Sequence, residues 1–456
     1  MHRVGTRTKV RPEMTVEEVR EIITREKIKT VIIAATDSAG VLRGKRLTVP
    51  YFYHAIEDGL HFASFLLGTT TMDEVLPGLF DTGIPDVKGV IDLSTFRVAP
   101  WESNTAIVFM DWATPEGSPH PLCPRSMLKR KVAEAKSMGF DSSASLELEF
   151  YLLPVSTAEV RKGRWSDIEP GSRDIHCYSI LEGHYWEPII GKLRDCFPNE
   201  IEGCLPEWGQ GQFEVNLHHS DPVKMADTSI LLKLATKQLA SQAGAMATFM
   251  AKFREDLSGC SGHIHISLQK TITKEPAFYD ADKPLRLSDT FKNFVAGNID
   301  VFSPSMIFYA PNVNSYKRLQ SMTFAGTTRN WAIDNRTTGF RAINATPRST
   351  RLEVRMAGAD VNPYYGLSIA LGSGLRGIRL GLVPPQPASG NAYDDNVDKV
   401  PTTLSAAVSC AAKDKAIREV LSPEVVDNAL RIADFELGVF ERTVTDLERR
   451  RYMETV

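Results

Sequence analysis

Two pairs of glutamates are spaced so that their carboxylates can meet around a cation. In the segment ASLELEFYLL, Glu147 and Glu149 are two residues apart, so both side chains project from one face of a strand. In LPEWGQGQFEV, Glu207 and Glu214 flank a glycine-rich turn. Each pair alone also fits a solvated surface, where most glutamates lie. Together the pairs indicate a site in which a cation offsets the repulsion between like charges.

Two further segments place imidazole and guanidinium groups on strand faces. In SGHIHISL, His263 and His265 share one face, whereas a single inward histidine is more often a hydrogen-bonded core residue. In TRLEVRM, Arg351, Glu353 and Arg355 share one face, which suits either water or a cleft that binds a polyanion. Glycines directly before the histidines favour a site where the backbone approaches a ligand closely.

Basic residues later in the chain extend this set of groups toward a metal–nucleotide complex with an acidic substrate. The planar fork of arginine suits carboxylates and phosphates, although scattered surface arginines are the commoner arrangement. Carboxylates with few imidazoles suit Mg²⁺ or Mn²⁺ better than zinc. The residue types alone therefore predict a metal-dependent enzyme with an anionic substrate, of which a two-metal phosphatase is the simplest example. The basic residues are Lys317, Arg318, Arg336, Arg341 and Arg348.

The elements that must position these groups alternate between strands and helices. A helix is expected from about Thr15 to Lys27, capped by Thr15 and Glu18, and a hairpin around DSAG follows it. Pro124 suits the first position of a helix that ends near Gly139. Strands are expected at 145–153, 211–217, 262–268 and 351–356, and a helix at 225–242.

The composition is that of an ordinary globular protein. A chain of 456 residues exceeds the usual size of one hydrophobic core, so two domains are expected. The 53 basic and 56 acidic residues nearly cancel, which predicts neither a nucleic acid nor a membrane surface as partner. No apolar run follows the basic N-terminus, so the cytoplasm is the expected location. The six scattered cysteines are expected to be free thiols.

Taken in order, motifs along nearly the whole chain resemble the glutamine synthetase family. The Arg-Gly-Lys triplet stands at 43–45, and the segment 85–95 resembles a stretch ending in Pro-Asp-x-Ser-Thr, although Ile91 replaces the proline. The E-x-E-F motif stands at 147–150 and the E-x6-E motif at 207–214. Chance does not explain so many motifs in order. The remaining motifs are Gly-His-Ile-His at 262–265, Asn-Ser-Tyr-Lys-Arg at 314–318, Asn-Arg at 335–336 and Arg-Leu-Glu-Val-Arg at 351–355.

The resemblance implies an α+β fold and an ATP-dependent carbon–nitrogen ligase. A small β-grasp domain would occupy residues 1–115, and a larger catalytic domain with helices flanking a curved antiparallel sheet would occupy 116–456. The oligomer would be a ring, typically a dodecamer, with active sites between subunits and two or more Mg²⁺ or Mn²⁺ per subunit. The γ-carboxylate of L-glutamate would attack the γ-phosphate of ATP, and an amine would displace phosphate from the resulting γ-glutamyl phosphate.

Carried over position by position, the resemblance also implies roles for individual residues. One divalent ion would be held by Glu149, Glu207 and Glu214, and a second by Glu147, His263 and Glu353. The transferring phosphoryl group would be contacted by His265, Arg336 and Arg341, and ATP also by Ser267, Arg348 and Arg351. Glutamate would be bound by Gly259, Arg318 and Arg355.

The pocket for the second substrate departs from ordinary glutamine synthetases. The family's Phe-Asp-Gly-Ser motif, whose aspartate helps bind ammonium, corresponds here to His61–Ser64, so Ala63 replaces the aspartate. Phe324 stands where the family's flap glutamate takes a proton from ammonium. Stripping water from ammonium without carboxylate partners is costly. The changes therefore favour an amine with a hydrocarbon body, such as an alkylamine or an arylamine, which would contact Ala63 and Phe324.

Three alternatives stay open within the family. An ordinary glutamine synthetase would use ammonium, and a γ-glutamylpolyamine synthetase would need an acid for the distal ammonium of its substrate. A non-catalytic structural member is disfavoured because all six metal positions hold glutamate or histidine, and buried carboxylates without a cation would be destabilising. Tyr393 lies near a tyrosine that some bacterial relatives adenylylate, but its surroundings differ, so that regulation is not predicted.

Overall fold

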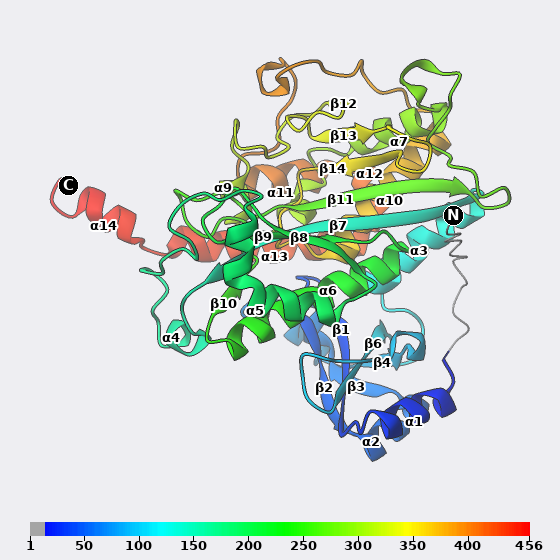
Figure 1. Cartoon of the computed structure of the whole chain (residues 1–456), viewed down its shortest axis with the longest axis vertical. Helices are drawn as coiled ribbons and strands as arrows, with labels where there is room; N and C mark the ends of the chain where they lie inside the picture. The colour runs from blue at the N-terminus through cyan, green and yellow to red at the C-terminus, as the bar shows by residue number, and fades with distance from the viewer. Residues whose placement is uncertain (1–13) are drawn as a thin grey trace.

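The structure is a computed structural model that describes residues 14–456 and contains a small N-terminal unit and a larger C-terminal unit (Figure 1). The expected α+β class is confirmed, with one sheet in each unit. No helix in this part of the chain is long and apolar enough to span a bilayer. All six cysteines are free thiols, as expected.

The small unit is a sheet of six strands with two helices packed against it (Figure 1). Its strand order is β2-β1-β6-β4-β3, with β5 paired to β6, and the β1–β6 pair is parallel while the other pairs are antiparallel. The expected first helix and hairpin are both confirmed, and Thr15 and Glu18 form the capping box. The elements are α1 (Val16–Arg25), β1 (Thr30–Thr36), β2 (Leu42–Thr48), α2 (Val49–Asp58), β3 (Leu60–Ala63), β4 (Asp86–Ile91), β5 (Arg97–Val98) and β6 (Thr105–Ala113).

Strand β1 is buried on both faces, because the small sheet lies between its own helices and the larger unit. Val31 and Ile33 belong to a core shared with Phe52 of α2. Ile32, on the opposite face, belongs to the main core together with Met127 of the larger unit. The run of apolar residues in β1 is therefore the pattern of a strand covered on two sides.

The larger sheet has eight strands in the order β12-β13-β14-β11-β7-β9-β8, with β10 paired to β7. Its pairs are antiparallel, as expected, except the short edge pair β12–β13, which is parallel. The strands are β7 (Phe140–Leu153), β8 (Ile201–Pro206), β9 (Gln212–Leu217), β10 (Met246–Thr248), β11 (Gly262–Lys270), β12 (Trp331–Ile333), β13 (Phe340–Ile343) and β14 (Arg351–Val354).

Helices cover one face of this sheet. Helix α3 begins at Pro124 as expected and ends before Gly139, whose φ of +86° suits a helix C-terminus. The other long helices are α5 (Ile180–Cys196), α6 (Pro222–Gln242), α7 (Asp289–Asp300), α10 (Pro363–Leu380), α11 (Leu404–Lys413) and α13 (Pro423–Arg442), and the shorter ones are α4 (Thr157–Arg161), α8 (Met306–Tyr309), α9 (Ser315–Arg318), α12 (Lys415–Val420) and α14 (Asp446–Tyr452).

Alternation along the central strands separates the core from the charged residues. On β7, Leu146 and Leu148 are fully buried in the main core, and on β11 the same is true of Ile264 and Ile266. Since successive side chains of a strand point to opposite faces, the residues between them project from the other side of the sheet. The charged pairs seen in the sequence therefore share the face that the core does not occupy.

A buried arginine joins the two units. Arg125 of α3 donates through Nε and Nη2 to Asp227 of α6 at 2.9 and 3.0 Å. Its Nη1 contacts Asp111 of β6 at 3.0 Å and Asp92 at 2.9 Å. Tyr364 also donates to Asp227 at 2.6 Å. One guanidinium thus neutralises carboxylates from both units.

Replacing Arg125 with leucine should lower the free energy of unfolding by about 3–5 kcal/mol, because the carboxylates left behind would be buried without a partner. Thermal and urea unfolding of the variant measure this loss. Arg130→Leu is the matched control, since Arg130 lies on the same helix but is exposed. Equal losses in the two variants would show that the arginine network does not hold the units together.

Candidate active site

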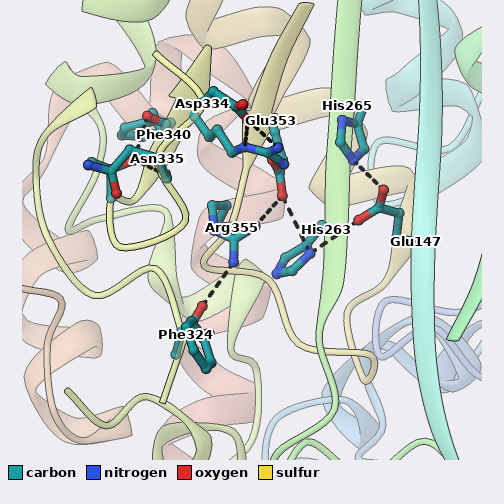
Figure 2. A network of polar contacts seen from close by, with 12 residues as sticks. Glu147, His263, His265, Phe324, Asp334, Asn335, Phe340, Glu353 and Arg355 are labelled. Atoms are coloured by element: carbon teal, nitrogen blue, oxygen red, sulfur yellow. Dashed lines mark hydrogen bonds and ion pairs between the residues drawn. The ribbon is translucent and has the colours of Figure 1, made fainter. Parts of the chain in front are cut away.

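Strand register brings four of the predicted residues together on the open face of the larger sheet. Glu147 of β7 lies opposite His263 of β11, and His265 of β11 lies opposite Glu353 of β14. Residues directly opposite in antiparallel strands project from the same face. Three strands that are distant in sequence therefore present their charged side chains to one another (Figure 2).

A cluster of three carboxylates lies beside them. Glu149 of β7 is opposite Glu214 of β9, and with Glu207 their carboxylate oxygens lie within 4.8 Å of one another. None of the three forms a salt bridge with another described residue, so their charges are not balanced from within this part of the chain. Burial, reinforced by Glu149, raises the pKa of Glu207 to about 7. Burial and the neighbouring Glu147, Glu149 and Glu207 raise the pKa of Glu214 to about 9.

This carboxylate cluster fits a divalent cation. Buried carboxylates with raised pKa values are held in an unfavourable state that a bound cation would relieve. The donors are all oxygen atoms, as Mg²⁺ and Mn²⁺ prefer. A separate group formed by Glu202, His218 and His219 is exposed, so its charges are free to be hydrated.

Hydrogen bonds from the backbone and from Gln212 fix the position of Glu149. Its Oε2 atom accepts from the amide of Ser261 at 2.6 Å and from Gln212 Nε2 at 3.0 Å. The same Gln212 nitrogen donates to the carbonyl of Gly259 at 3.0 Å. The side chain of Gln212 thus links the predicted metal site to the predicted glutamate site. Its place two residues before Glu214, on the same strand face, was a sequence signal that could have identified it.

Two histidines and two glutamates form a second group. His263 Nδ1 lies 3.4 Å from Glu147 and 3.5 Å from Glu353, and His265 Nε2 lies 3.1 Å from Glu147 (Figure 2). Burial and the charge of Arg355 lower the pKa of His263, which favours the neutral imidazole that binds metals. The ligating atoms of Glu147, His265 and Glu353 also come within 4.8 Å of one another. Both histidines therefore lie within reach of a cation at this position.

Glu353 is fully buried, and arginines balance its charge. Arg341 Nη1 lies 2.8 Å from one of its oxygens, and Arg355 forms an ion pair with the other. Burial alone would raise the pKa of this carboxyl group, but Arg355, His265 and His263 lower it to about 2. Arg341 also donates to Asp334 through Nε at 3.0 Å, a partner that the sequence did not single out. Arg341 is thus held on both sides next to the predicted phosphate position.

Of the remaining residues predicted to contact phosphate or ATP, Arg351 contacts this second group directly. Arg351 donates to His265 Nδ1 at 3.1 Å. Arg336 is exposed, and its positive charge opposes the rise in the pKa of Glu207, which places the arginine near the carboxylate cluster. Ser267 follows His265 by two residues on the same face of β11, and Arg348 is exposed in the segment before β14.

The residues predicted to bind glutamate also lie together. A side chain at Gly259 would meet Arg318 Cγ at 2.5 Å and the carbonyl of Ala251 at 2.8 Å, so only glycine fits there. Arg318 is buried and donates to the carbonyls of Met356 and Arg355 at 2.9 and 3.3 Å. Gly259, Arg318 and Arg355 are therefore neighbours, as predicted from the sequence.

The two predicted amine-pocket residues lie in different units of the chain. Ala63 ends β3 of the small sheet, whereas Phe324 follows α9 in the larger unit, and its carbonyl accepts from Arg355 Nη2 at 3.0 Å (Figure 2). No contact joins these two residues within the single chain. The ring of Phe324 instead meets Trp208, a residue adjacent to Glu207 that the sequence did not single out.

Comparison with known proteins gives one family throughout. Residues 121–452 match the family described as "Glutamine synthetase, catalytic domain". A glutamate–isopropylamine ligase of a Pseudomonas species is 34% identical over 96% of this chain and 98% of its own. A type-1 glutamine synthetase of Dictyostelium discoideum is 35% identical over 93% of this chain and 84% of its own, and a γ-glutamylethanolamide synthetase of Streptomyces coelicolor is 32% identical over 97% and 96%. A solved GmaS–ADP complex superposes with a TM-score of 0.83 at 25% identity, covering 95% of this chain and 98% of that chain.

The raised pKa values predict how pH and Mg²⁺ affect stability. Because the folded-state pKa values of Glu207 and Glu214 lie above the ordinary 4.5, the metal-free protein should lose stability as pH rises from 4.5 through 7 and on to 9. Millimolar Mg²⁺ should raise the Tm, and the increase should grow with pH to at least about 3 °C at pH 8.5. Differential scanning fluorimetry across pH, with and without Mg²⁺, measures both effects.

Two variants test whether the pH dependence and the Mg²⁺ effect on stability come from the carboxylate cluster or from other acidic groups. Glu214→Gln should flatten the pH dependence of the metal-free protein and remove most of the increase caused by Mg²⁺. Glu202→Gln is the control, because Glu202 is exposed on the adjoining strand β8. An Mg²⁺ effect that is independent of pH, or that survives Glu214→Gln, would contradict the assignment.

Proposed function

The chain belongs to the glutamine synthetase family, and from that membership we propose that it joins the γ-carboxylate of L-glutamate to a primary amine with a hydrocarbon body, using ATP. The observation that carries the proposal is Phe324. Its side chain is exposed and its backbone carbonyl accepts a hydrogen bond from Arg355, at the position where the family has a glutamate that serves ammonium. A relative with 34% identity is a glutamate–isopropylamine ligase, which supports an alkylamine as the nucleophile.

The two ligand groups supply the charges that phosphoryl transfer requires. One Mg²⁺ or Mn²⁺ would be held by the carboxylate cluster, and a second by Glu147, His263 and Glu353. When bound, the ions would neutralise charge on the phosphate oxygens. His265, Arg336 and Arg341 would orient the γ-phosphate, while Ser267, Arg348 and Arg351 would contact the rest of ATP. Catalysis would then consist mainly of positioning and electrostatic stabilisation.

The reaction would proceed in two substitutions. Arg355, together with Arg318 and Gly259, would hold glutamate so that an oxygen of its γ-carboxylate attacks the γ-phosphorus, and the bond to ADP breaks. The nitrogen of the neutral amine would then attack the acyl carbon of γ-glutamyl phosphate, the carbon–oxygen bond to phosphate would break, and the nitrogen would pass one proton to the departing phosphate or to solvent as the amide forms. Gln212, which donates to both Glu149 and the carbonyl of Gly259, would hold the metal ligand and the glutamate-binding glycine in a fixed relative position for the first step.

The amine pocket would be completed by a second subunit. Ala63 lies at the end of β3, away from Phe324 in its own chain, so we assign its contact with the amine to a neighbouring copy in a ring-shaped oligomer. The dodecamer and a cytoplasmic location belong to the same proposal. A small side chain at position 63 would leave room for the hydrocarbon part of the amine.

The wild-type enzyme should release phosphate from ATP fastest with an alkylamine or an arylamine. The assay contains L-glutamate, Mg²⁺ and one of ammonium, ethanolamine, putrescine, isopropylamine or aniline. We expect kcat/KM for isopropylamine to exceed that for ammonium by at least about tenfold. An apolar pocket would stabilise the alkyl group of isopropylamine, and it lacks the carboxylates that ammonium needs. Preference for ammonium would identify an ordinary glutamine synthetase, and phosphate release without any amine would indicate a phosphatase.

Restoring the two acids should shift the preference toward ammonium. In the double variant Ala63→Asp and Phe324→Glu, the ratio of kcat/KM for ammonium to that for isopropylamine should rise at least about tenfold, since carboxylates stabilise the small cation and crowd the carbon chain. The double variant Ala63→Asn and Phe324→Gln is the uncharged control, because asparagine and glutamine have nearly the same shapes as aspartate and glutamate. A ratio that changes equally in both double variants would mean that size rather than charge sets the preference.

A further inference from the structure

Trp208 and Phe324 form an exposed aromatic pair next to the carboxylate cluster. Their ring centroids are 6.2 Å apart and the ring planes meet at 67°, an edge-to-face arrangement. Trp208 is 53% exposed and Phe324 is 55% exposed, so about half of each residue is open to solvent in the chain. Large aromatic side chains are usually more deeply buried than this, and an exposed pair marks a binding surface.

The backbone around Trp208 is fixed by the same turn that presents Glu207. The amide of Trp208 donates to the Glu207 carboxylate at 2.9 Å, and the amide of Glu207 donates to the carbonyl of Gln212 at 2.8 Å. At Gly209, a side chain would meet the hydroxyl of Tyr151 at 2.1 Å, so the turn packs closely onto the strand beneath it. The carboxylate of Glu207 therefore points into the cluster while the indole of the next residue faces outward.

The backbone of Phe324 is fixed independently of its side chain. Its φ of +58° is unusual for a bulky residue, and its surroundings must therefore hold it in place. The carbonyl of Phe324 accepts from Arg355 at 3.0 Å, and the carbonyl of Ala325 accepts from the Tyr393 hydroxyl at 2.9 Å. Both rings of the pair are thus presented by rigid backbone at the edge of the site.

From this geometry we infer that Trp208 is a specificity residue of the proposed ligase, and that it binds the hydrocarbon body of the amine against Phe324. The inference rests on the proposed function and names the chemical class more closely as a short alkylamine without a second charged group. Aromatic rings bind alkyl groups through dispersion and through removal of apolar surface from water. A distal ammonium, as in a diamine, would meet the apolar pair instead of an acid.

The test compares amines in variants of the active enzyme. Trp208→Ala should lower kcat/KM for isopropylamine at least about tenfold, mainly through KM, while kcat/KM for ammonium and the KM values for glutamate and ATP change by less than about twofold. Trp208→Phe should keep most of the activity with isopropylamine. This second variant distinguishes loss of the aromatic ring from misfolding of the protein. Trp165→Ala is the matched control, because Trp165 is 69% exposed and is not among the predicted site residues.

Each outcome has one meaning. An equal loss with ammonium and isopropylamine in Trp208→Ala, or an effect no larger than that of Trp165→Ala, would overturn the aromatic subsite while leaving the ligase intact. A wild-type enzyme that uses only ammonium would overturn the proposed function and the subsite together. A selective loss of kcat/KM for isopropylamine in Trp208→Ala, with most of that activity kept in Trp208→Phe, would support both the proposed function and the aromatic subsite.

Discussion

Repulsion among three closely spaced carboxylates at the sheet is the constraint on which the site depends. Glu149, Glu207 and Glu214 approach within 4.8 Å and form no salt bridge with a described residue, and burial together with this proximity raises the pKa values of Glu207 and Glu214. Such an arrangement persists only where strong packing and hydrogen bonds enforce it. The rigid supports found here, an eight-stranded sheet backed by a large core, supply that enforcement.

In the neighbouring histidine-containing group, by contrast, the carboxylate charge is balanced by arginines. Glu353 is completely buried as well, yet Arg341 and Arg355 keep it ionised, so its charge is already balanced before any cation binds. Two sites a few residues apart on one sheet therefore differ in how much they gain from a divalent ion. A cation in the carboxylate cluster would relieve charges that no described salt bridge balances, whereas the charge of Glu353 already has two arginine partners.

Much of the site could be predicted because charged and apolar residues alternate along the strands, and this alternation is visible in the sequence. The spacing of Glu147 and Glu149, and of His263 and His265, predicted both the strands and the face that carries the charges, and the register confirms that these faces meet. The parallel pairing of β12 and β13 could not be predicted, since both strands are only three or four residues long and their order depends on distant contacts. Trp208 and Asp334 were missed for a related reason, because their partners lie far away in the sequence or across a turn. Gln212 was missed although its spacing from Glu214 would have identified it.

The loop that carries Phe324 is anchored through two carbonyl oxygens, one bound by Arg355 and one by Tyr393. Every amino acid possesses a carbonyl, so the placement of this loop does not depend on which side chain stands at position 324. A point substitution there can therefore change the side chain that faces the amine without moving Arg355, which the proposal assigns to glutamate binding. The scaffold thereby separates the part of the enzyme that can diverge from the part that cannot, which makes changes of amine accessible in single evolutionary steps.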